Sequence, residues 1–360
     1  MRALLLMSLA LAAVACGDPY ESRSGNVLEA HVTRVLETAE ILSPAGRQQL
    51  TQRLEIELDG SLYRGDRVEV GWGGRVPITR NGLLQAGDRV LVSQRRATDD
   101  SREYSIEEVV RLPLLAPVAG TALLALLAVA RLKGVASIVG LAASVAVFLL
   151  AVVPALQRGE DPLVATLIGS ALILVATVYL VHGLNRKSTA ALAGTTVGLG
   201  VVAGLGALGI ALTRITGLGD EESVFLAVGT GFGIDMTKLV LAGIIVASLG
   251  ALVDMAIGQS STTFELASID RSLRGRALYA SALNVGRDHI GSLVNTLALA
   301  YFGGALPLIL LLSLGNAPLA VALNGETIAA SLLGVVAATC GLVVAVPVTT
   351  AAAVALVRSR

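Results

Sequence analysis

Long apolar runs alternate with short polar connections through the last two thirds of the chain. A helix that crosses a bilayer needs about 17 to 25 mostly apolar residues, and seven runs meet this length. The stretch 224–234 is shorter and broken by glycine, so we expect it to be re-entrant or interfacial rather than an eighth crossing. The predicted crossings are 114–130, 135–156, 163–181, 189–212, 239–257, 290–314 and 327–357.

The pattern before residue 113 is different, because short β-prone runs are separated there by Gly and Asp turn signals. The motif Gly-Asp-Arg-Val-x-Val occurs twice, beginning at Gly65 and Gly87, and indicates a turn that leads into a strand. We therefore predict a small all-β domain, barrel-like or sandwich-like, at 17–112, followed by a membrane all-α bundle of about seven helices at 113–360. The candidate strands are 27–35, 54–58, 67–70, 89–93 and 103–109.

Residues 1–16 have the form of a bacterial secretion signal, with one Arg, a short apolar run and small residues before Cys16. The apolar run is too short to span a membrane comfortably. Two interpretations remain: a lipoprotein-type signal in which Cys16 is lipidated, or an uncleaved signal anchor. Both predict that the β domain at 17–112 is extracytoplasmic.

Composition supports a membrane protein, since 54% of residues are hydrophobic and 15% are charged, with a mean hydropathy of +0.75. Of the 54 charged residues, 29 fall between 17 and 112, so the remainder is more apolar than the average. In that first part 16 acidic residues are interspersed with 13 arginines, and no basic stripe is present, which argues against nucleic-acid binding.

Other chemistries find little support in the sequence. Two cysteines and three scattered histidines do not suggest a disulfide or a metal site. No nucleophile is paired with a base, and no phosphate-binding loop motif occurs, so we expect neither an enzyme nor a cofactor.

The basic residues of the connections predict an orientation. If 17–112 lies outside, the alternate connections that fall inside hold ten Lys and Arg residues, whereas the outer ones hold three. We expect a bacterial inner-membrane protein with its C-terminus in the cytoplasm.

Polar groups interrupt two of the apolar segments and mark the strongest candidate site. Asp254 lies near the end of the fifth predicted helix, on one face with small residues that include Gly250 and Gly258. The next segment begins with polar residues at the same predicted membrane level. An ionisable group in a bilayer costs about 2.5–3.5 kcal/mol, so it normally faces a partner helix or a wet cavity. These polar residues are Arg287, Asp288, Ser292 and Asn295.

Two interpretations of this hairpin remain open. A carboxylate cluster at one depth is suited to binding a cation or relaying a proton. Alternatively, Asp288 caps a helix, Arg287 neutralises Asp254, and Asn295 joins helices by hydrogen bonding. Separately, Gly194 and Gly198 in the fourth predicted helix have the small-xxx-small spacing that allows close helix packing.

Five segments carry a recognisable pattern when taken together: 183–195, 250–254 and 286–301, with 324–329 and 347–349 in addition. As a set they resemble the YibE/F family of bacterial multi-pass membrane proteins. The resemblance implies a multi-pass membrane protein and leaves the biochemical activity open.

The sequence thus supports two functions. We expect a transporter or channel for a small ion or solute, with the polar hairpin as its site. The alternative is a non-transporting scaffold whose external β domain binds an envelope partner. In both cases the bilayer is a partner, and a homo-oligomer is compatible with the sequence.

Overall fold

The computed structural model describes residues 27–42, 48–59, 65–73, 77–96, 102–315 and 318–358. The chain divides into two units, Met1–Val129 and Ala130–Arg360. The predicted signal at 1–16, with Cys16, lies outside the described residues, so its processing stays a prediction.

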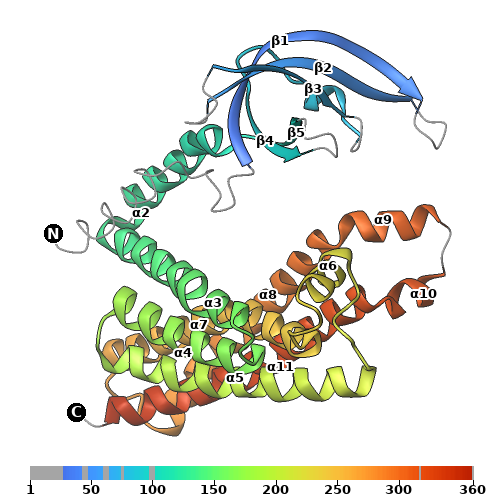
Figure 1. The fold of residues 1–360 in the computed structure, drawn as a ribbon. Coiled ribbons are helices and arrows are strands. Elements are labelled where there is room, and N and C mark those ends of the chain that lie inside the picture. Colours follow the sequence, from blue (N-terminus) through green and yellow to red (C-terminus); the bar gives the residue numbers. More distant parts are fainter. Residues whose placement is uncertain are drawn as a thin grey trace. The chain divides into compact units, whose positions relative to one another are not determined.

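The first unit contains an antiparallel five-stranded sheet in the order β3-β2-β1-β4-β5 (Figure 1). The outer strands β3 and β5 also contact each other, so the sheet curls into a half-barrel. This confirms the predicted β region and favours the barrel-like form over the sandwich. The strands are β1 (Val27–Leu42), β2 (Gln48–Leu58), β3 (Arg67–Trp72), β4 (Arg89–Arg96) and β5 (Arg102–Val109).

Alternating side chains build the core of this half-barrel. Leu54, Ile56 and Leu58 of β2 are fully buried at every second position, as the period of a strand requires. Both repeated motifs form turns that lead into strands, with Gly65 at φ +92° and Gly87 at φ +97°. Glycine suits these positions because it adopts positive φ without steric cost. The repeat therefore predicted β3 and β4 correctly.

Helices and their connections make up the described chain after the sheet, and the first unit also contains a short 3-10 helix, η1 (Arg80–Gly82). The sequence-derived crossings at 163–181, 189–212 and 327–357 correspond closely to α4, α5 and α11. The elements are α2 (Leu112–Val147), the π-helical η2 (Phe148–Val152), α3 (Val153–Gln157), α4 (Pro162–His182), α5 (Arg186–Thr213), α6 (Glu221–Gly229), α7 (Met236–Ile269), α8 (Arg276–Gly304), α9 (Leu306–Leu314), α10 (Leu319–Asn324) and α11 (Glu326–Arg358).

Five helical segments in the described chain are long and apolar enough to cross a membrane, or six if the bent pair α8 and α9 counts as one. The first two predicted crossings lie in one long helical segment, Leu112–Gln157. This segment is kinked at Arg131, whose dihedral angles are not helical (φ 51°, ψ −128°). The pair α8 and α9 bends by 61° at Ala305, just before Pro307. Proline at this position starts a new helix, which explains the break in the predicted run 290–314.

Helices α5, α7 and α11 pack side by side and form the centre of the second unit (Figure 1). Their fully buried side chains include Leu252 and Met255 of α7 and Leu342 of α11. Glycines allow close approach: a Cβ atom on Gly198 would lie 2.9 Å from both Ala345 Cβ and Leu252 Cδ2. The small-residue pattern of α5 thus corresponds to tight packing.

Candidate functional site

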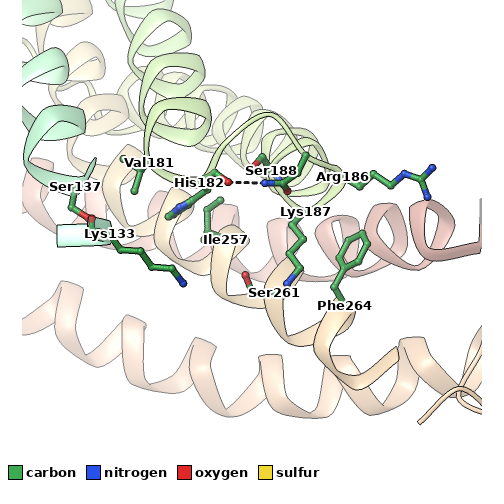
Figure 2. A pocket seen from close by; sticks show the side chains of 11 residues that line it. Lys133, Ser137, Val181, His182, Arg186, Lys187, Ser188, Ile257, Ser261 and Phe264 are labelled. Atoms are coloured by element: carbon green, nitrogen blue, oxygen red, sulfur yellow. Dashed lines mark hydrogen bonds between the residues drawn. The ribbon is translucent and has the colours of Figure 1, made fainter. Parts of the chain in front are cut away.

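A cavity of about 980 Å³ opens at one end of the second unit, between α2, α4, the first turn of α5, and α7 (Figure 2). Eight of its eleven lining residues are polar or charged, although apolar atoms cover about half of the wall. The residues that line it are Lys133 and Ser137 of α2, Val181 and His182 of α4, Asn185, Arg186, Lys187 and Ser188 at the start of α5, and Ile257, Ser261 and Phe264 of α7.

The charged groups of the cavity are all basic. Lys133, Arg186 and Lys187 contribute three cations, His182 adds a titratable imidazole, and no carboxylate is among the lining residues. Figure 2 shows Lys133 and Lys187 extending toward the same space below His182, whereas Arg186 extends away. Arg186 instead donates through Nη1 to the carbonyl of Leu356, 3.2 Å away.

The connection between α4 and α5 places these residues. Gly183 ends α4 at φ +79°. Asn185 then caps α5: its Oδ1 accepts from the Ser188 amide at 3.0 Å, and its Nδ2 donates to the His182 carbonyl at 2.6 Å. Asn is a favoured N-cap because its side chain satisfies an amide that the helix leaves free. The cap fixes Arg186 and Lys187 at the first two positions of α5.

Both the backbone and the side chain of Lys187 contact residues of α7. The hydroxyl of Ser260 donates to the Lys187 carbonyl at 2.8 Å. The Lys187 ammonium lies 6.0 Å from the centroid of the Phe264 ring, at the limit of a cation–π contact. Both contacts come from α7 and therefore tie the start of α5 to the far end of α7.

Asp254 lies on the face of α7 that carries the cavity residues. The positions of Asp254, Ile257 and Ser261 follow the i, i+3, i+7 spacing of one helical face, so Asp254 lies one turn away from the lining residues. Its side chain is exposed, and its charge is close enough to act on His182 of α4. Gly243 and Gly250, on the same face, are exposed as well, and a Cβ on either would meet nothing within 4 Å.

The polar residues of α8 lie elsewhere. Arg287 donates to Asn284 of its own helix at 3.0 Å, and no ion pair joins it to Asp254 among the described residues. Asp288, Ser292 and Asn295 are exposed on the side of α8 away from Ile290 and Leu293, which pack on the core. The structure therefore brings Asp254 together with α4 and the cavity rather than with this group of α8 residues.

The glycines singled out from the sequence lie in different surroundings. Gly194 and Gly198 of α5 are buried against α11. Gly258 lies beside α8, where a Cβ would be 3.8 Å from His289 Cε1. Gly250 is on the open face described above.

Sequence reasoning missed Lys133, His182 and Lys187 as site residues. In the sequence, the basic connections indicate only an orientation, and the 183–195 segment indicates only a family resemblance. Two signals were available: Asn185 as an N-cap before two cations, and a basic residue in each of two neighbouring connections. Neither reveals a cavity without knowledge of which helices pack together.

At the opposite end of the second unit, an ion pair and a set of hydrogen bonds join the starts of the helices to their neighbours. Lys238 at the start of α7 forms an ion pair with Asp161, the N-cap of α4. The hydrogen bond from Lys238 lowers the pKa of Asp161, although partial burial opposes the shift. Glu326 at the start of α11 accepts from the backbone amides of Thr216, Gly217 and Leu218 at 3.0, 2.6 and 3.2 Å.

Among the described residues, no group of three His, Cys, Asp or Glu side chains could hold a metal ion. The basic lining of the cavity is suited to an anion or a polar solute.

Residues 118–359 match a family model whose description is YibE/F-like protein. The chain belongs to the YibE/F family. The match covers nearly all of the described helices, including the cavity and Asp254, and agrees with a multi-pass membrane protein. No curated protein and no solved structure matches the chain.

Proposed function

We propose that this YibE/F protein carries a small solute across the membrane and that the cavity between α2, α4, α5 and α7 is its binding site at one membrane face. The cavity is the observation that carries the proposal, because a hollow of about 980 Å³ with several charged and polar side chains, set beside apolar helices, indicates contact with water or a solute. We propose no enzymatic step.

A face of α7 extends from the cavity toward the opposite end of the bundle. Its small residues are exposed, and Asp254 is its ionisable group. A carboxylate exposed to lipid would be costly, so a wet path along this face is the more favourable environment. This arrangement supports transport with Asp254 as the group that binds a co-transported cation or proton.

The proposal includes seven crossings. The segment Leu112–Gln157 has 46 residues, about 69 Å as a helix, which is more than twice the hydrocarbon thickness of about 30 Å. Arg131 interrupts it near the middle, and Lys133 follows. Two crossings with Arg131 and Lys133 at one surface fit these lengths. With the pair α8 and α9 as one crossing, the total is seven.

This arrangement, with the β half-barrel outside, gives the cavity a cytoplasmic location in a bacterial inner membrane. The excess of basic residues at the cavity end supports that orientation.

Flux measurements with the purified full chain in liposomes test the proposal. We expect proton or solute flux that is abolished in Asp254→Asn, because the neutral amide keeps the size of the side chain and removes its charge. Asp288→Asn is the matched control, since it removes an exposed charge from the face of α8 that points away from the core. Absence of flux over a broad panel of ions, or full flux in Asp254→Asn, would contradict the proposal.

The scaffold alternative rests on the β half-barrel. Ile41 and Leu42 at the end of β1 are 43% and 73% exposed, which leaves apolar surface for a partner. Crosslinking in intact cells from a photoreactive residue at Leu42 tests this function. A specific envelope partner together with absence of flux would favour the scaffold over the transporter.

A further inference from the structure

Lysine is distributed unevenly in this chain. Only three of the 27 basic residues are lysines: Lys133, Lys187 and Lys238. The first two line the cavity, whereas Lys238 is paired with Asp161 at the other end of the second unit. Two of the three lysine side chains therefore line one cavity.

The two cavity lysines have no salt-bridge partner among the described residues, although the charge of Asp254 acts on His182 in the same cavity. Arg186, the third cation, turns away toward Leu356. Two cations that face one space repel each other, so an anion between them would lower the energy of both.

The start of α5 adds to this positive potential. Helix α5 has 28 residues, and its Asn185 cap satisfies the Ser188 amide. The amides of Arg186 and Lys187 in the same turn have no acceptor within the helix. Such a helix start carries a partial positive charge and provides N–H donors for anions.

The remaining donors favour an oxyanion over a halide. His182 and Ser261 add an imidazole and a hydroxyl to the lining that holds the ammonium groups, whereas the hydroxyl of Ser137 already donates to the Lys133 carbonyl at 3.0 Å. A phosphate group carries several charged oxygens and can accept from donors on different sides at once. The volume of about 980 Å³ also leaves room for a substituent on that group.

We propose that the cavity binds a phosphate group, with Lys133 and Lys187 as its cationic ligands. The group belongs either to a free phosphate compound or to the headgroup of an anionic lipid, which basic pockets between membrane helices also bind. Phosphate compounds would then be the ligand class of the proposed solute-binding cavity. The physiological meaning of this site rests on the proposed function, but binding of phosphate is measurable without transport.

The small number of lysines makes the test direct. The full chain in neutral detergent is treated with an amine-acylating reagent, and the modification of each lysine is measured by peptide mass spectrometry. Inorganic phosphate is compared with chloride at equal ionic strength. At a concentration of about ten times Kd, mass action leaves about a tenth of the sites empty, so modification of Lys133 and Lys187 should fall about tenfold. Lys238, held by Asp161, is the internal control and should not change.

A second arm identifies the source of the phosphate group. The same labelling is performed in nanodiscs of phosphatidylglycerol and in nanodiscs of phosphatidylcholine. Protection by inorganic phosphate supports a free phosphate ligand, and protection only in phosphatidylglycerol supports a lipid headgroup. Equal modification of both lysines under all conditions, or equal protection of Lys238, would overturn the proposal.

The labelling result is independent of the flux result. Protection without flux would leave the phosphate site standing and refute the transport function. Flux without protection of the lysines would support the transport function and refute the phosphate site. In Lys133→Gln, protection of Lys187 should weaken, whereas Arg271→Gln, which removes an exposed cation beyond the end of α7, should leave it unchanged.

Discussion

The hydroxyl of Thr349 on α11 occupies the space that a side chain at Gly194 on α5 would need. A Cβ on Gly194 would lie 1.7 Å from Thr349 Oγ1. That oxygen is buried and has no hydrogen-bond partner among the described residues. Close packing of the two helices therefore depends on glycine at one position and leaves a polar atom unsatisfied at the other.

Gly194→Ala is expected to destabilise the helical unit by about 1–3 kcal/mol, the usual cost of overpacking. Thermal unfolding in detergent measures this change. Gly200→Ala is the matched control, because a Cβ there meets nothing within 4 Å and alanine favours the helix. Adding Thr349→Ala to Gly194→Ala should restore part of the stability, whereas equal loss in Gly194→Ala and Gly200→Ala would contradict this packing.

The contact between Asp161 and Lys238 gives a pH dependence. The pKa of Asp161 is lowered from 3.8 in the folded protein by the hydrogen bond from Lys238. A lowered folded-state pKa means that the stabilisation is present above pH 3.8 and is lost as the pH falls through the lower value. Asp161→Asn should therefore be less stable than the natural chain at neutral pH and equally stable in strong acid.

Asparagine is the informative substitution because it remains a good N-cap for α4 and removes only the charge. Unfolding temperatures of both proteins across the acid range provide the measurement. A stability difference that persists unchanged at the lowest pH would show that the ion pair is not its origin.

The number of crossings in Leu112–Gln157 can be determined by cysteine labelling. We introduce Arg111→Cys and Arg158→Cys separately, with Cys16 and Cys340 replaced by alanine, and apply an impermeant maleimide to oriented vesicles. Two crossings place both positions on the same membrane side, whereas a single crossing places them on opposite sides. Labelling from opposite sides would reduce the proposed seven crossings to six.

Removing the carboxylate of Glu326 is expected to weaken the contact between α11 and the loop after α5. Hydrogen bonds to a charged group contribute about 1.5–3 kcal/mol, so Glu326→Ala should destabilise by about that amount or somewhat less at this partly exposed position. Glu222→Ala in the first turn of α6 is the control, because that residue is exposed. Chemical unfolding should separate the two variants, and equal stabilities would refute the role of Glu326.

The sequence predicted the helical unit well where apolar runs coincide with helices. The run 163–181 became Pro162–His182, because Asp161 with Pro162 marks the start and Gly183 the end. The helix α7 continues for twelve residues beyond the predicted end at 257, to Ile269. The predicted helix ends at 257 because polar residues follow in the sequence. One of them, Gln259, is nevertheless buried inside the helix, where it donates to the Ala282 carbonyl and to Thr350 Oγ1. Hydropathy cannot distinguish such a partnered amide from one in water.

The candidate site could be predicted only in part. Asp254 was identified because a carboxylate in an apolar helix is costly wherever it lies. Its surroundings depend on which face of α7 meets α4, and a single sequence does not specify that pairing. For the same reason the sequence predicts Arg287 and Asp288 at the membrane depth of Asp254 but does not predict that they lie on a different surface of the bundle.

The mode of binding at Glu326 has a consequence for how relatives of this protein diverge. Its carboxylate accepts from the main-chain amides of Thr216, Gly217 and Leu218, which every residue except proline possesses. A substitution at position 218 leaves all three amide donors intact, whereas position 216 also supplies a hydroxyl that donates to both carboxylate oxygens, at 3.0 and 2.9 Å. Position 326 lacks the freedom of position 218, and position 217 needs glycine, since a Cβ there would lie 2.4 Å from the Met236 carbonyl oxygen. An acid and a glycine, far apart in sequence, should therefore persist together across the family, with a hydroxyl-bearing residue favoured at 216, while position 218 varies.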